Sequence, residues 1–111
     1  MPELREDILE ARTGLHRVFF TEVRGGYELT ASWHLVQAVG DLNEIGFYFR
    51  AKHGEWKFET QDKQGHVFHN EHPNHFVRRG MYDQMKPNAM TIEWSSRILR
   101  KCLGEYWDRL K

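Results

Sequence analysis

The sequence lacks most of the features that assign a function directly. It holds a single cysteine, Cys102, in 111 residues, which excludes an internal disulfide, a CxxC redox pair and a cysteine-based zinc finger. No apolar run approaches 18 residues, so no membrane-spanning helix is predicted. Phosphate-binding loops, the nucleophile elbow and the dinucleotide-binding fingerprint are also missing, because Gly25-Gly26 lacks their spacing.

Neither sign of charge is in excess. Lys and Arg number 16, and Asp and Glu also number 16, so the formal net charge is zero with the seven histidines neutral. Nonspecific DNA-binding domains usually have a high pI, so this balance argues against that class. Aromatic residues make up 14% of the chain, which argues against disorder. The first residues are too acidic and polar for a signal peptide, so we expect a cytoplasmic protein with no membrane partner.

The length predicts one domain over 1–111 with one hydrophobic core. Between Leu15 and about His69, apolar and polar residues alternate with a period of two, and the clearest stretch is 27–35. This pattern, broken by short turns, predicts an antiparallel β-meander of four to five strands. The segment 31–39 also has apolar residues at helical spacing, so a helix there remains an alternative.

Two helices are expected to flank the sheet, which makes the fold class α+β. Residues 2–12 begin with a proline and acidic side chains, carry a narrow apolar stripe and are followed by Gly14, a pattern typical of a short helix. A longer helix is expected from Ala89 to about Leu110, with Asn88 as its cap. Its broad apolar face predicts that it packs on one face of the sheet. The intervening residues 70–88 are expected to be irregular, with helical turns in 76–85.

Four of the seven histidines occupy one short segment at a spacing of three: His66, His69, His72 and His75. One interpretation is metal binding by His66, His69 and His72, with Glu71 or Asp62 nearby, since imidazole and carboxylate groups bind zinc, nickel or ferrous iron. The segment lacks a helical HxxxH pair, so this spacing alone fixes no metal geometry. A plain solvated loop is the competing interpretation.

A third interpretation of the same segment is acid–base catalysis without a metal. RNA cleavage of that kind needs a base, an acid and a cation for the phosphate. His69, His72 and His75 are candidates for the first two roles, and Arg78 and Arg79 for the third.

Aromatic and basic side chains are also mixed along the predicted strands, where Tyr48 and Arg50 are candidate binding residues. Such a mixture can stack bases and hold phosphates, but Glu55 and Glu59 are interleaved with it, and an ordinary mixed-charge surface is the alternative. Tyr82 is a further candidate as a hydrogen-bonding group. Trp94 lies off the main stripe of the last helix, where an exposed aromatic residue can mark a partner surface.

Because no catalytic motif is complete, the leading hypothesis is a small cytosolic interaction or regulatory module that self-associates, as a homodimer, and binds a protein or RNA partner. The alternative is a small metal-independent ribonuclease-like protein, or a metal-binding hydrolase, that uses the segment His66–Arg79. The sequence identifies no cofactor.

Overall fold

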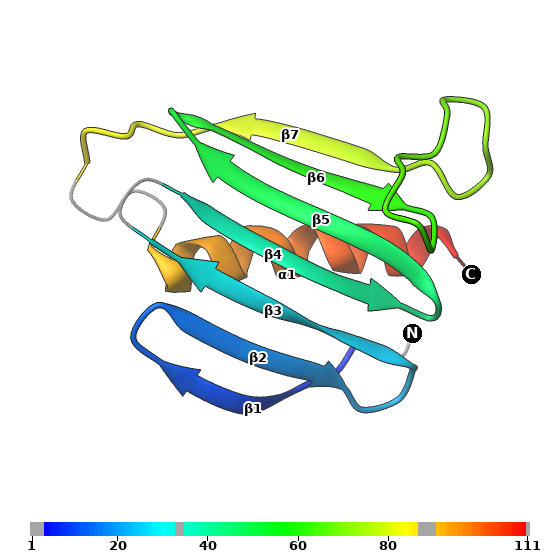
Figure 1. Cartoon of the computed structure of the whole chain (residues 1–111), viewed down its shortest axis with the longest axis horizontal. Helices are drawn as coiled ribbons and strands as arrows, with labels where there is room; N and C mark the ends of the chain where they lie inside the picture. The colour runs from blue at the N-terminus through cyan, green and yellow to red at the C-terminus, as the bar shows by residue number, and fades with distance from the viewer. Residues whose placement is uncertain (1–3, 33–34, 87–90, 111) are drawn as a thin grey trace.

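A computed structural model describes residues 4–32, 35–86 and 91–110. The described residues form one antiparallel sheet of seven strands in chain order, followed by one helix (Figure 1). The elements are β1 (Glu6–Arg12), β2 (Leu15–Phe20), β3 (Gly25–Ala31), β4 (Val36–Leu42), β5 (Ile45–Lys52), β6 (Glu55–Gln61), β7 (Val77–Met81) and α1 (Ile92–Arg109). The expected meander is therefore present, but the expected number of four to five strands is wrong.

The N-terminal helix expected over residues 2–12 is also wrong, because this segment forms the edge strand β1. Its backbone pairs with β2 from Glu6 opposite Phe20 to Arg12 opposite Leu15, with a bulge between Ile8 and Glu10. A helix this short is marginal in water unless it packs on a core. Pairing with β2 gives the segment backbone hydrogen bonds even though its apolar side chains are not buried in a core. Ile8, for example, remains 48% exposed.

The sequence pattern also hid a turn inside the stretch 27–35. Strand β3 ends at Ala31, and Ser32 and Leu35 exchange backbone hydrogen bonds of 2.8 and 3.4 Å that close a hairpin. The segment 31–39 is thus the end of one strand and the start of the next, and neither a single strand nor a helix. Trp33 and His34, which belonged to the predicted strand, lie outside the described residues.

The last strand was missed because its segment was expected to be irregular or helical. Residues Val77–Met81 instead pair with β6 as β7. The optional fifth strand of the predicted meander, at its end in residues 66–69, is not formed, and only an isolated bridge joins Gln61 and Val67. Both differences arise from long-range pairing across the loop, which a local sequence pattern does not report.

The long C-terminal helix is confirmed, with Thr91 as its cap. The Thr91 Oγ1 atom accepts a hydrogen bond of 3.2 Å from the backbone N–H of Trp94. Asn88, the expected cap, lies outside the described residues. In the described ranges no helix has the length and apolar character needed to cross a membrane.

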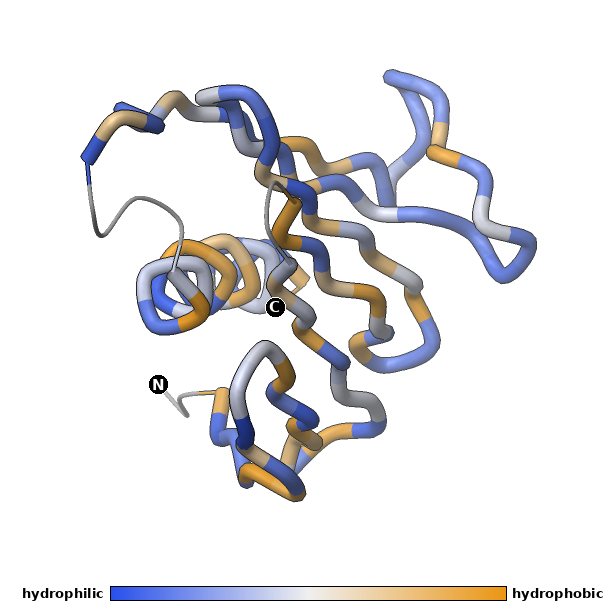
Figure 2. Tube along the Cα trace, turned by 60° about the vertical axis from the view of Figure 1, so that its left-hand side comes forward, coloured by the Kyte–Doolittle hydropathy of each residue, from blue (hydrophilic) through white to orange (hydrophobic). Residues whose placement is uncertain are grey.

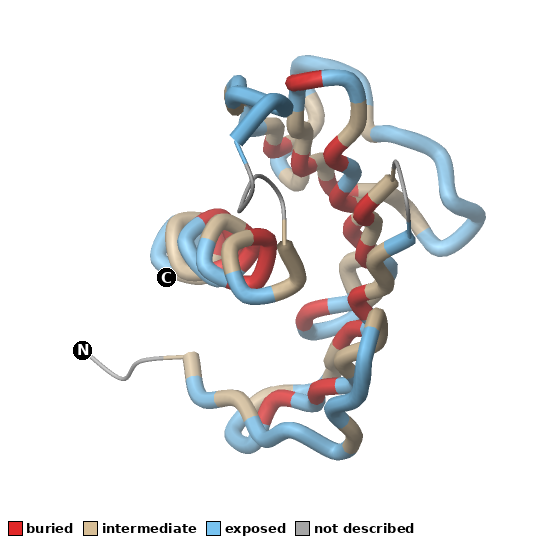
Figure 3. Tube along the Cα trace, turned by 90° about the vertical axis from the view of Figure 1, so that its left-hand side faces the viewer, coloured by how far each residue is buried: buried red, intermediate tan, exposed pale blue. Residues whose placement is uncertain are grey.

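Helix α1 lies along one face of the curved sheet, and the buried positions of both elements face each other (Figure 3). In Figure 2, apolar residues, drawn in orange, recur at intervals along the strands and the helix. The largest fully buried side chains include Phe47, Phe49, Phe58, Leu99, Leu103 and Tyr106. At the margin, Glu6 of β1 accepts hydrogen bonds from Tyr27 of β3 at 3.1 Å and Arg100 of α1 at 2.9 Å. Burial and the nearby Glu6 carboxylate raise the pKa of Tyr27.

Two glycine substitutions should change stability in opposite directions. A Cβ atom on Gly40 would overlap the Gly26 carbonyl oxygen and lie 2.8 Å from the Tyr27 Cα atom, so Gly40→Ala must push β3 and β4 apart. We expect it to lower the free energy of unfolding by about 1–3 kcal/mol. Gly104 of α1 has open space at this position, so Gly104→Ala should raise stability by about 0.5–1 kcal/mol. Urea unfolding measures both, and equal effects would contradict this packing.

Candidate functional site

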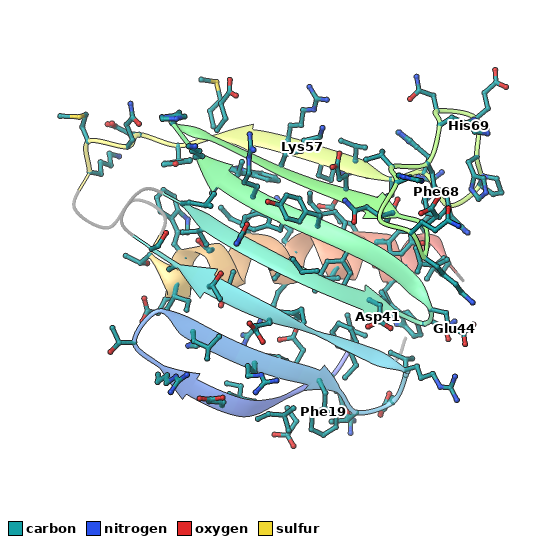
Figure 4. The ribbon with its side chains drawn as sticks, in the orientation of Figure 1. Phe19, Asp41, Glu44, Lys57, Phe68 and His69 are labelled. Carbon is teal, nitrogen blue, oxygen red and sulfur yellow. The ribbon has the colours of Figure 1, made fainter. Side chains whose placement is uncertain are left out.

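The face of the sheet opposite α1 is left open by the described residues. Figure 1 looks onto this open face, with the helix behind the strands, and in Figure 4 the side chain of Lys57 stands on it. Across β5–β7 the face is hollowed, with a volume of about 590 Å³. The hollow is lined by Tyr48, Arg50, Lys52, Glu55, Trp56, Lys57, Glu59, Arg79, Gly80 and Met81.

Three cations form a row across this hollow. Arg50 of β5 lies directly opposite Lys57 of β6, and Lys57 lies directly opposite Arg79 of β7. Neighbouring strands are about 4.8 Å apart, and like charges in directly opposite positions destabilise a sheet. The side chains of Arg50 and Arg79 make no ion pair or hydrogen bond with any residue that the structure describes. The row therefore concentrates positive charge, and two of its three cations, Arg50 and Arg79, have no described ion-pair partner.

The row continues toward the middle of the sheet as uncharged polar residues. Gln37 of β4 lies opposite Arg50, and Thr30 of β3 lies opposite Gln37. Tyr48 lies in the neighbouring row between Val39 and Glu59, and its hydroxyl donates a hydrogen bond of 3.1 Å to the Gln37 Oε1 atom. Val39 is 56% exposed. Tyr48 and Val39 thus form a small apolar platform beside the cation row.

On the β1–β3 side of the same open face, positive and negative side chains pair with each other. Arg17 of β2 pairs with Glu10 at 3.6 Å and with Glu28 at 3.3 Å. Lys57 is the one member of the cation row with a described ion pair, to Glu59 at 2.9 Å. The excess positive charge is therefore confined to the β5–β7 side of the open face.

The binding residues expected from the sequence are divided by the fold. Tyr48 and Arg50 meet in the hollow. Tyr82 follows β7, packs against the core and is not among the lining residues of the hollow. Trp94 is half-buried in the first turn of α1, beside a separate hollow of about 450 Å³.

The histidine segment forms a polar loop that projects from the ends of β6 and β7 (Figure 2). Its spacing of three builds consecutive turns, since the His72 N–H donates to the His69 carbonyl and the His75 N–H to the His72 carbonyl, each at 3.0 Å. The His72 ring stacks on Phe68 with a centroid distance of 4.4 Å. Figure 4 labels Phe68 and His69 in this loop. The regular spacing is thus explained by turn geometry.

Two imidazoles of the loop use their Nδ1 atoms to hold the backbone. The Nδ1 atom of His69 accepts the N–H of Glu71 at 3.3 Å, and that of His72 accepts the N–H of Asn74 at 3.0 Å. An Nδ1 atom that accepts leaves the proton on Nε2 in the neutral ring. Each ring therefore offers its surroundings an N–H donor, whereas a general base needs a free lone pair.

The other members of the expected catalytic set point in different directions. Both ring nitrogens of His75 are buried and have no hydrogen-bond partner among the described residues. Arg78 faces α1, where its Nε atom donates to Glu105 at 2.7 Å and its guanidinium lies 4.1 Å from the centroid of the Phe76 ring. Arg79, the next residue of the strand, lines the hollow on the opposite face. The fold thus separates Arg78 and Arg79.

The expected metal ligands do not converge either. Within 4–32, 35–86 and 91–110, no three His, Cys, Asp or Glu side chains are placed to hold a metal ion. The Nδ1 atom of His66 lies 3.8 Å from Asp62 Oδ2. Asp62 accepts backbone N–H bonds from His66 at 3.0 Å and Gln64 at 2.8 Å, and these bonds lower its pKa. Asp62 and His66 together stabilise the turn that begins the loop.

Sequence reasoning did not recognise the row that Lys57 forms with Arg50 and Arg79, or the position of Glu59 beside Tyr48. Part of the signal was present, because the two-residue turn His53-Gly54 pairs Arg50 with Lys57 by simple counting. The third member was out of reach, because β7 returns only after a 15-residue connection, 62–76. Comparison with protein-family models, curated proteins and solved structures found no match for this chain.

The two half-buried histidines of the loop should respond differently to replacement. His72→Leu removes the bond from Asn74 and the ring stacked on Phe68, so we expect a loss of about 1 kcal/mol of stability. His75→Leu removes two buried nitrogens that lack described partners, so we expect equal or higher stability. Thermal unfolding at pH 7.5 compares the two variants. A His75→Leu protein clearly less stable than His72→Leu would show that the His75 ring makes a stabilising polar contact.

Proposed function

We propose that the protein is a binding module for single-stranded nucleic acid and that it binds on the open face of β4–β7. The observation that carries this proposal is the row Arg50–Lys57–Arg79, in which like charges lie directly opposite each other on neighbouring strands. Such a row costs stability in the free protein. A polyanion that neutralises the row would recover this cost and release its own counterions.

The platform beside the row favours a single strand over a duplex. Sheet-based readers of single strands stack unpaired bases on aromatic side chains while basic residues hold the backbone. Tyr48 and Val39 provide such a surface directly beside Arg50 and Lys57. The bases of a duplex are stacked on one another, and their edges are read by an element that enters a groove. A broad sheet face presents no such element.

The proposal is for binding without catalysis. The residues expected to cleave RNA do not meet, because the His75 nitrogens are buried and Arg78 is bound to Glu105 on the helix side. His69 and His72 belong to the loop at the ends of the strands, and their Nδ1 atoms hold turns. The proposal is thus a specific form of the interaction module expected from the sequence, with a nucleic acid as its partner. Self-association stays a prediction.

Neutralising a cation of the row should weaken binding without weakening the fold. We expect Arg50→Gln and Arg79→Gln each to reduce affinity for a 12-nucleotide RNA about tenfold at low salt, the effect of one lost charge-assisted contact. Each should also reduce the slope of log affinity against log salt by about 0.7. The unfolding free energy should stay equal or rise by a few tenths of a kcal/mol, because one like-charge pair is removed. Fluorescence anisotropy and urea unfolding measure these quantities.

Arg17→Gln is the matched control for this experiment. Arg17 lies on the same face, but two carboxylates neutralise it and it does not line the hollow. Its replacement should leave RNA affinity unchanged and lower stability by up to about 1 kcal/mol. Absence of wild-type binding to single-stranded RNA and DNA, or equal losses from all three variants, would overturn the proposal. Parallel titrations with DNA of the same length separate the two kinds of strand.

Replacing Tyr48 tests the stacking surface separately from the charge. Tyr48→Leu should weaken binding of a single strand about tenfold, since stacking one base on an aromatic ring contributes about 1–3 kcal/mol. Tyr48→Phe keeps the ring and loses only the hydrogen bond to Gln37, so its affinity should stay close to that of the wild type. Anisotropy titrations compare the two variants, and circular dichroism checks the fold. Equal affinities for both would show that the ring does not contact a base.

A further inference from the structure

A partly buried carboxylate stands beside the stacking surface. Glu59 of β6 lies directly opposite Tyr48 and lines the hollow, and its side chain is only 13% exposed. One carboxylate oxygen, Oε2, lies 2.9 Å from the Lys57 ammonium. The other oxygen, Oε1, has no hydrogen-bond donor among the residues that the structure describes. Glu59 therefore brings an available acceptor to the edge of the platform, in a site otherwise rich in cations.

We infer that Glu59 selects which base stacks on Tyr48 and that it favours bases with an exocyclic amino group, cytosine and adenine, over uracil. This inference rests on the proposed function. An ionised carboxylate can only accept hydrogen bonds. Cytosine N4 and adenine N6 carry hydrogens that a carboxylate can accept, whereas the corresponding position of a uracil-type base is the O4 carbonyl, itself an acceptor.

The partial burial of Glu59 and its ion pair with Lys57 increase the difference in affinity between bases. A base whose carbonyl oxygen faces Oε1 leaves a partly buried acceptor unpaired, and such mismatches cost more than a weak contact would gain. The ion pair with Lys57, two residues along the same strand, restrains the carboxylate and reduces the entropy lost on binding. Lys57 thus has two functions, as a member of the cation row and as the partner that orients Glu59.

The other carboxylate that lines the hollow is placed differently. Glu55 is exposed and lies between Lys52 and Met81 in the paired strands, away from the row of Tyr48. Glu28 of β3 lies opposite Val39, at the far side of the platform, and is outside the hollow. Like Glu59, Glu28 is paired with a cation, Arg17 at 3.3 Å. It is therefore a matched control for the charge and the ion pair of Glu59.

The test uses nine-nucleotide homopolymers of cytidine, adenosine and uridine at pH 7.5, measured by fluorescence anisotropy with the full chain. We expect the wild type to bind the cytidine and adenosine strands about tenfold more tightly than the uridine strand. Glu59→Gln adds a donor and removes one negative charge, so affinity for every strand should rise while the ratio between strands falls toward one. Glu28→Gln removes the same charge and should leave the ratio at its wild-type value.

The outcomes separate this inference from the function on which it rests. Tight binding of all three strands with equal affinity leaves the proposed function in place and overturns the role of Glu59. A ratio that survives Glu59→Gln, or that Glu28→Gln abolishes equally, also overturns it. If none of the strands binds the wild type, the proposed function fails and the inference fails with it. Circular dichroism of both variants confirms that the sheet is intact.

Discussion

One helix can cover only one face of a seven-stranded sheet, and this constraint shapes the rest of the molecule. Helix α1 buries Leu99, Leu103 and Tyr106 against the inner side chains of the sheet. The strict alternation of the strands then sends every second residue to the other face, where charged and polar groups meet water. The hydrophobic core thus lies on the helix side of the sheet, and the side chains of the open face are not needed for core packing.

The parts of the fold that follow from local periodicity could be predicted, and those that depend on distant partners could not. The alternation around Phe47 and Phe58 and the apolar stripe of α1 each report burial on one face. Residues Glu6–Arg12 carry a weak helical stripe, but the free edge of β2 decides their conformation. The boundary between β3, which ends at Ala31, and β4, which begins at Val36, was hidden because the alternation of the sequence continues across it.

The candidate site shows the same division. Tyr48 and Arg50 were recognised as possible contacts because aromatic and basic side chains on strands have a known chemistry. The cation row to which Arg50 belongs depends on the strand register, which places Arg50 opposite Lys57 and Lys57 opposite Arg79. A shift of one residue would place these side chains on the opposite face. The histidines were conspicuous in sequence, but their spacing serves the turns of a loop whose ends are fixed by Asp62 and Thr60.

A net charge of zero therefore describes an average over an uneven surface. Acidic side chains neutralise Arg17 on one side of the open face and tie Arg100 to the margin of the sheet through Glu6. On the other side, Arg50 and Arg79 are left without described partners around Lys57. The chain has as many carboxylates as cations. The one that is partly buried in the hollow, Glu59, is held by Lys57 and forms no ion pair with Arg50 or Arg79. The separation of charge within a neutral chain leaves the β5–β7 side of the open face positive, and the position of Tyr48 beside that charge is the reason for proposing a strand with exposed bases as its ligand.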